Sequence, residues 1–309
     1  MSKENTAVTK KKLKRCKEDV VFDTACFIIL TVVLFVVAYP LYWVIISSIS
    51  APSAVSSGKV LLHPIGFTLK GYAEVFKNDQ VMRGFLNSLI ITFCGVMVNL
   101  IVTLPTSYAL SRSNFSGKKP ITIFYLITMF FGGGLIPTYL VIQRLQMLNT
   151  IWALILPGCL SVYNMIVART FFKSNISEEL YEAAEIDGCT QARFFFQIAL
   201  PLSKAIIAIL VLYYGVGHWN SYFSALVYIS DKAKYPLQLV LRNILITNQT
   251  ALSQTATTAA ARAALQEKQQ LIDVMKYSLI IISSIPVLVM YPLVQKHFVK
   301  GVMIGSMKG

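Results

Sequence analysis

Apolar segments long enough to cross a lipid bilayer recur along the whole chain. A hydrocarbon core of ~30 Å is spanned by roughly 20 helical residues. Of the 309 residues, 55% are hydrophobic and 14% are charged, whereas soluble domains carry about 25% charged residues. The sequence therefore predicts an all-α polytopic membrane protein. We expect six transmembrane helices, at Val20–Ser47, Phe85–Leu110, Ile121–Ile142, Ile151–Phe172, Ile206–Val227 and Val274–Val294.

The basic residues indicate how these spans are oriented. The transmembrane domain, residues 20–294, lies between a basic tail, 1–19, and a second tail, 295–309. Because Lys and Arg are retained on the cytoplasmic side during insertion, the more basic segments are expected there. If the N-terminus is cytoplasmic, the segments on the cytoplasmic side carry 17 Lys and Arg, and the segments on the opposite side carry 10. The count predicts a cell-membrane protein with both termini cytoplasmic.

The basic head followed by an apolar run also describes a signal peptide. This apolar run is too long for a signal-peptide core, and further spans follow it. We therefore interpret Val20–Ser47 as an uncleaved anchor and keep a cleaved signal as the alternative.

Several classes of function are excluded by the composition. The net charge of +14 does not form the aromatic-interleaved stripe of a nucleic-acid binder. The five cysteines have no metal-ligand spacing and are interpreted as small core hydrophobes, with acylation of Cys16 as an alternative. No nucleophile, base and orienting group can be assembled. We expect no enzymatic activity and no cofactor in this chain.

The most informative segment is the loop 173–203 between the fourth and fifth spans. Ser177 or Asn175 can cap a helix whose first turn holds Glu178, which the helix dipole favours. Gly188 can end that helix without a Cβ penalty. The sequence thus predicts a short helix on the cytoplasmic side.

This helix and the one after it form a predicted elbow. Leu180, Ala183 and Ala184 recur three and four apart and share one low face that another surface can approach closely. A second helix, Gln191–Ala199, is expected to stop near Pro201. The alternative is an ordinary capped surface helix.

The spacing of residues in this loop resembles the EAA loop of binding-protein-dependent ABC importer permeases. The resemblance implies a type I permease fold in which the loop is a coupling helix seated in a cleft of an ATPase. Glu182 would pair with the ATPase, Ala183 and Ala184 would permit close approach, and Gly188 would make the turn. The matching positions are Glu182, Ala183, Ala184, Gly188, Ile198, Leu200 and Pro201.

The resemblance also implies partners. These are a second homologous permease subunit, a cytoplasmic ATPase dimer that binds ATP and magnesium, and an extracellular solute-binding protein. Further stretches resemble the MalG-type carbohydrate permeases, and one pair resembles a subset that imports larger glycans, which implies an oligosaccharide substrate. The first group is Asn87–Leu89, Ser107–Arg112 and the tail from Tyr291; the pair is Phe131–Tyr139 and Leu148–Leu154.

Polar or broken helix inside the bilayer marks where a substrate could pass, since irregular backbone survives there only within protein or beside a cavity. Gly133 is the centre of a three-glycine run in the third span, although close helix packing through small residues is the favoured alternative. Asn99 and Asn164 are mid-membrane candidates, with bonding to a neighbouring helix as the alternative.

The fifth span combines aromatic rings with hydrogen-bonding groups, as carbohydrate sites do. Its candidates are Tyr214, His218, Trp219 and Asn220, with interfacial anchoring as the alternative. Charged residues are missing from the core of every predicted span, which disfavours an ion-coupled transporter.

Three other functions stay open at this stage. An ABC permease for peptides would share the scaffold. An ion-coupled transporter would need intramembrane ionisable residues, and a membrane-embedded enzyme would need clustered catalytic groups. Outside the membrane we expect two long loops, Ser48–Gly84 and Ile229–Asp273, the second containing a polar helix at Ala251–Gln269.

Overall fold

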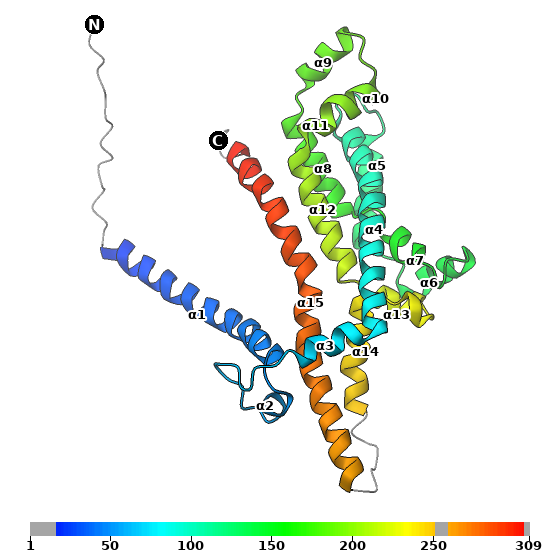
Figure 1. Ribbon diagram of the computed structural model, residues 1–309. Coiled ribbons are helices and arrows are strands. Elements are labelled where there is room, and N and C mark those ends of the chain that lie inside the picture. The colour runs from blue at the N-terminus through cyan, green and yellow to red at the C-terminus, as the bar shows by residue number, and fades with distance from the viewer. Residues whose placement is uncertain (1–16, 251–258, 306–309) are drawn as a thin grey trace.

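The computed structural model describes residues 17–250 and 259–305. The predicted basic tail before Lys17, together with Cys16 and the final four residues, lies outside the described residues. Within the described part of the chain every regular element is a helix and no strand occurs (Figure 1). The all-α prediction is therefore confirmed for these residues.

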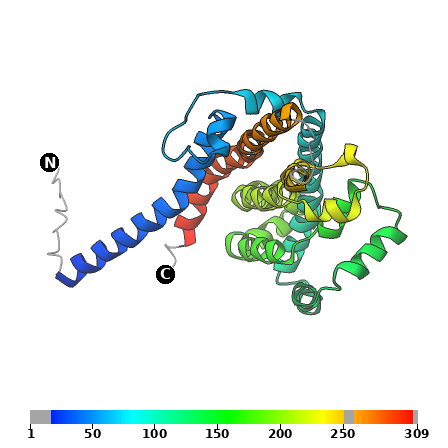
Figure 2. The same cartoon turned by 90° about the horizontal axis from the view of Figure 1, so that it is seen from below.

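Three helices are long and apolar enough to cross a membrane unbroken. They confirm the first, second and sixth predicted spans. One of them, α1, extends away from the rest of the molecule (Figures 1 and 2), and none of its most apolar 18-residue window is buried. The three are α1 (Lys17–Ser48), α4 (Asp79–Ser111) and the membrane-spanning part of α15 (Ala259–Gly305).

The polar helix expected at Ala251–Gln269 is in part the beginning of α15. Its first eight residues lie outside the described ranges, and from Ala259 the chain runs as one 47-residue helix into the last span. The C-terminal end of α15 points toward the same end of the molecule as the loop 173–203 (Figure 1).

The third and fourth predicted spans are each divided into two helices by a break. The third divides into α5 (Lys118–Phe130) and α6 (Leu135–Arg144), and the chain direction bends by 113° between them. The fourth divides at 52° between the Trp152–Gly158 segment and α8 (Val162–Asn175). Glycines fill the first break, and Pro157 and Gly158 precede the second; both residue types weaken a helix interior.

The segment Trp152–Gly158 is itself composite. It begins as α7 (Trp152–Ile155) and tightens into the 3-10 turn η1 (Leu156–Gly158). A 3-10 turn at a helix end is a common way to satisfy terminal carbonyls.

The fifth predicted span also ends early. Its helix α12 (Lys204–Trp219) stops before Asn220, and a separate helix α13 (Phe223–Tyr228) follows. The intervening Asn and Ser compete for backbone hydrogen bonds and favour a turn. With these bends, up to six crossings remain if each of the three bent pairs counts as one span. The pair that makes the fifth span is Gln191–Leu202 with α12, bent by 79°.

Short elements at the opposite end from loop 173–203 link the long helices. They are α2 (Pro52–Ser56), α3 (Lys70–Lys77), η3 (Lys232–Lys234) and α14 (Leu237–Thr250). The side chain of Asn87 donates to the carbonyls of Ala233 and Tyr235, at 2.8 and 3.1 Å. Ser88 Oγ accepts from the backbone N–H of Leu237 at 2.8 Å. These bonds explain why two polar residues open the second span.

Helix α4 is the centre of the bundle. It packs against α8, α12 and α14, while α15 packs against α1, α3, α12 and α14. The largest buried cluster joins α4, α8, α12 and the loop 173–203, with Leu104, Phe172 and Leu210 in its interior. The loop is therefore built on the same core that holds the membrane helices.

Candidate functional site

The loop 173–203 folds into the predicted elbow. Its first helix, α9 (Glu178–Ile186), is capped by Ser177, whose Oγ accepts from the N–H of Leu180 at 3.3 Å. Asn175, the other capping candidate, is the last residue of α8. Gly188 follows α9 with φ +74, a conformation that glycine adopts without Cβ strain. The predicted cap and turn are both confirmed.

The outward face of α9 differs from the predicted one. We expected Leu180, Ala183 and Ala184 to share it, but Ala184 packs on the bundle core beneath the helix. Ala183 and Glu182 are exposed. The reason is that the Tyr181 side chain, only 7% exposed, lies on the face of α9 that packs on the core. Ala184 is three residues further on and lies on the same face of the helix.

Ile186 is a feature of this face that sequence reasoning missed. Its side chain is 86% exposed, more than that of any other large hydrophobic residue for which the exposure is described. Glu179, Glu182 and Glu185 are exposed around the same helix. A partner docked on this face would bury the Ile186 side chain and remove its apolar surface from water. The signal in the sequence was an isoleucine at the end of an otherwise acidic and small-residue helix.

The second part of the elbow does not stop before Pro201. It runs as α10 (Gln191–Phe194), a π-helical turn η2 (Phe195–Ala199) and α11 (Leu200–Leu202). The widened π turn leaves room for the proline ring, which would clash with the preceding turn of a regular helix. The helix thus ends at Leu202, next to Pro201 as predicted, but three residues after the predicted end at Ala199.

The last three residues of the predicted pattern differ in burial. Ile198 and Leu200 are half-buried and pack against the bundle core, whereas Pro201 is exposed. Ile198 and Leu200 therefore hold the elbow on the membrane helices rather than contributing to its outward face.

One cation connects the elbow to α4. The guanidinium of Arg112, at the end of α4, lies 3.8 Å from the ring centroid of Tyr181. Its Nη2 lies 3.1 Å from Oε1 of Glu178. The sequence analysis names Arg112 only as the last residue of Ser107–Arg112. Its contact with Glu178 joins positions 66 residues apart, which no local pattern shows.

The candidate pathway residue Asn99 is completely buried. Its Nδ2 donates to the carbonyls of Gly158 and Cys159, each at 2.8 Å, and its Oδ1 lies 2.7 Å from Nε2 of His218. These carbonyls are freed by the break before α8. The contacts support the alternative considered for Asn99, bonding to a neighbouring helix, rather than exposure to a pathway.

Tyr214 and Trp219 are likewise core residues. The hydroxyl of Tyr214 lies 2.8 Å from Thr103 Oγ1 and accepts from the N–H of Ser161 at 3.2 Å. The indole N–H of Trp219 donates to the carbonyl of Ser283 at 2.8 Å.

The remaining polar candidates differ in exposure. Asn164, in the first turn of α8, is 7% exposed. His218 is half-buried and Asn220 is exposed. Among the polar and aromatic candidates, Asn220 therefore retains the most accessible side chain, together with its exposed neighbours Tyr213 and Tyr222.

The glycine run does not pack against another helix of this chain. A Cβ at Gly132 or Gly134 would have no neighbour within 4 Å, and one at Gly133 would meet only Pro137 at 3.9 Å. Close packing through small residues, the favoured interpretation of the run, is therefore not found within the described chain. The run instead separates α5 from α6.

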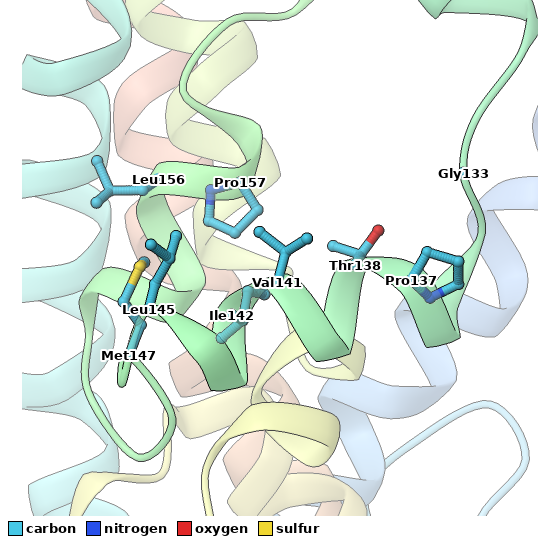
Figure 3. A pocket seen from close by; sticks show the side chains of 9 residues that line it. All are labelled: Gly133, Pro137, Thr138, Val141, Ile142, Leu145, Met147, Leu156 and Pro157. Atoms are coloured by element: carbon cyan, nitrogen blue, oxygen red, sulfur yellow. The ribbon is translucent and has the colours of Figure 1, made fainter.

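Gly133 lines a cavity of about 460 Å³ between α6 and the turn at Pro157 (Figure 3). Its walls are mainly apolar. Thr138 carries the one polar side chain, and its hydroxyl donates to the carbonyl of Gly134 in the same helix turn. The cavity thus offers little hydrogen bonding to a sugar. The lining residues are Gly133, Pro137, Thr138, Val141, Ile142, Leu145, Met147, Leu156 and Pro157.

The described residues contain no group of three or more His, Cys, Asp or Glu that could hold a metal. Apolar crossings with three bends, joined by a capped elbow that presents an acidic and apolar face, define a multi-pass membrane protein. The comparisons with known proteins identify its family.

No protein-family model matches the chain. It is 36% identical to the polygalacturonan/rhamnogalacturonan transport system permease protein YtcP of Bacillus subtilis, over 93% of this chain and 98% of that one. It is 38% identical to protein LplC of the same organism, over 94% and 95%. A crystal structure of a bacterial ABC transporter involved in the import of the acidic polysaccharide alginate aligns with a TM-score of 0.82. That match has 27% identity and covers 93% of this chain and 99% of the other. The chain belongs to the MalG-type permease subunits of carbohydrate ABC importers.

Proposed function

We propose that this chain forms one half of the path by which an ABC importer takes up an oligosaccharide. The observation that carries the coupling part of the proposal is the outward face of α9, where Ile186 is 86% exposed among exposed carboxylates. A helix of nine residues is marginal in water by itself. The aromatic core beneath the elbow holds it rigid, so a displacement of α9 by the ATPase would be transmitted to the membrane helices.

The substrate class is supported by the relatives. The relatives are named as transport systems for polygalacturonan or rhamnogalacturonan, galactooligosaccharides and diacetylchitobiose, and the structural relative is involved in alginate import. These are oligomeric or polymeric carbohydrates. A peptide permease or an ion-coupled transporter finds no such support among them.

The proposed mechanism is alternating access. ATP and magnesium are bound by the partner ATPase dimer, and this chain contributes no cofactor and no catalytic group. Closure of that dimer draws the elbows of the two permease subunits together. The path then opens outward to accept the sugar from the extracellular binding protein, and hydrolysis resets it.

The proposal places both chain termini on the cytoplasmic side. It is supported by the basic bias of the predicted inside segments and by the position of the end of α15 near the level of the elbow (Figure 1). The second permease subunit would cover apolar surface that this chain leaves open, because α1 buries none of its most apolar window.

The experiment is a pull-down of the ATPase by this permease, with Ile186→Asp, Glu182→Ala and Ala183→Trp on the α9 face. We expect each variant to weaken capture of the ATPase, Ala183→Trp by bulk and the others by lost contact. Lys59→Ala, an exposed residue of the opposite end, is the control. Capture unchanged in all three variants would contradict the assignment of this face.

A further inference from the structure

Beside the aromatic core that α4 shares with the elbow, one cation, Arg112, binds the end of α4 to α9. Its side chain is only 12% exposed, which is unusual for a cation whose hydration must be replaced. Two groups replace it: the carboxylate of Glu178 at 3.1 Å and the ring of Tyr181 at 3.8 Å. Both belong to α9, whereas Arg112 is the C-cap of α4.

The geometry uses the shape of the guanidinium as well as its charge. A planar guanidinium stacks on an aromatic face while its edge donates to a carboxylate, and an ammonium cannot do both in the same way. The rings of Tyr108 and Phe194 lie further out, each with its centroid 5.9 Å from the Arg112 guanidinium carbon. Arg112 therefore contacts α4, α9 and α10 at once.

The partners of Arg112 are themselves held in place. Ser113 Oγ donates to Oε1 of Glu178 at 2.6 Å. Lys118 Nζ donates to the carbonyls of Arg112 and Ser113, at 3.2 and 2.8 Å. Close by, Arg169 Nε donates to the carbonyl of Leu110 at 3.0 Å. The end of α4 and the start of α9 are thus fixed relative to each other.

We propose that Arg112 is the positioning residue that makes α9 and α4 move as one body, so that a displacement of the docked elbow reaches the membrane helices. This inference rests on the proposed function of α9 as the ATPase-coupling helix. It extends that function by naming the connection through which the displacement passes. Without Arg112, α9 would keep its outward face and its apolar packing but lose the charged contact that fixes its position against the end of α4.

The test uses hydrogen–deuterium exchange in the complex of this chain with its partner permease and ATPase. Each complex is measured without nucleotide and after trapping with ADP and vanadate. The variants are Arg112→Ala and Arg112→Lys. Lys119→Ala, an exposed cation at the start of α5, is the matched control.

In the wild-type complex we expect trapping to alter exchange in both α9 and α4. In Arg112→Ala we expect the ATPase to remain bound and basal hydrolysis to persist. The amides of α9 should exchange about tenfold faster, because a helix this short depends on its tertiary contacts. The response of α4 to trapping should be lost while that of α9 persists. For both the α9 exchange rate and the α4 response, Arg112→Lys should lie between the wild type and Arg112→Ala. Lys119→Ala should match the wild type in both.

The outcomes separate the inference from the function it rests on. A wild-type chain that does not bind the ATPase, or shows no response in α9, overturns the proposed function. A normal α4 response in Arg112→Ala overturns the role of Arg112 and leaves the function intact. If Arg112→Ala does not assemble, Arg112→Lys decides: an α4 response equal to that of the wild type overturns the inference, and a reduced response in a complex that still binds the ATPase supports it.

Discussion

His218 Nε2 and Asn99 Oδ1 lie 2.7 Å apart and join α12 to α4 across 119 positions of sequence. The same Asn99 side chain donates to two carbonyls at the break before α8. Three membrane helices are thus connected at one buried amide. The arrangement satisfies backbone groups that a broken helix would otherwise leave unpaired away from water.

Replacing Asn99 with Leu should destabilise the protein. Leucine has a similar size but donates no hydrogen bond, so the carbonyls of Gly158 and Cys159 would lose their partner. An unsatisfied buried polar group costs about 1–3 kcal/mol. The check is the thermal unfolding midpoint of the purified chain in detergent, with the exposed Asn220→Leu as control. Equal midpoints for the two variants would contradict this account of Asn99.

Replacing Gly95 with Ala should separate α4 from α12. A Cβ at Gly95 would lie 2.5 Å from Nε2 of His218, and overpacking of this kind typically costs about 1–3 kcal/mol. Gly217, on α12, has no atom within 4 Å of an added Cβ. Gly217→Ala should therefore be neutral or slightly stabilising, since alanine favours a helix by about 0.5–1 kcal/mol over glycine. A thermal midpoint for Gly95→Ala at or above that of Gly217→Ala would argue against the contact.

Replacing Gly188 should disturb the elbow in proportion to how poorly the new residue tolerates positive φ. At φ +74 the left-handed backbone conformation costs alanine roughly 1–2 kcal/mol, whereas asparagine tolerates this region better. We expect ATPase capture to fall in the order glycine, asparagine, alanine, valine. Outside the adjacent residues no atom lies within 4 Å of an added Cβ, so the cost of alanine here comes from the backbone conformation. Equal capture by all four would show that the turn is not needed for docking.

The two ends of the glycine run should respond differently to alanine. Gly134 has φ 85 and ψ 176, a region that is essentially restricted to glycine and costs on the order of 1–3 kcal/mol for other residues. Gly132 has no positive φ and no close neighbour. Limited proteolysis between α5 and α6 should therefore increase in Gly134→Ala and stay unchanged in Gly132→Ala. The reverse order would contradict the backbone geometry at this break.

Local patterns in the sequence predicted the crossings and the elbow because they depend on neighbouring residues. Apolar length identifies α1 and α4, and the cap at Ser177 with the turn at Gly188 delimits α9. The glycine run marked the break in the third span. The breaks in the fourth and fifth spans were missed because hydropathy averages over them, and a glycine or proline inside an apolar run still scores as apolar.

Side-chain direction was the second limit of prediction. Helical spacing placed Leu180, Ala183 and Ala184 together, but burial of Tyr181 rotates the helix so that Ile186 and Glu182 face outward. The contacts of Asn99 and Arg112 join residues 59 to 119 positions apart. No local pattern shows such partners, which is why a buried bond and a pathway lining could not be told apart for Asn99.

The most direct test of the account is a cross-link from Ile186→Cys to the ATPase, in a chain whose own five cysteines are replaced. The account predicts that this cysteine is trapped against the nucleotide-binding subunit, and that Lys59→Cys at the opposite end of the bundle is not. It also predicts that a membrane-impermeant thiol reagent added outside intact cells labels Lys59→Cys and leaves Ile186→Cys unmodified. Labelling of Ile186→Cys from outside, or its failure to cross-link in an assembled complex, would contradict the coupling role of α9.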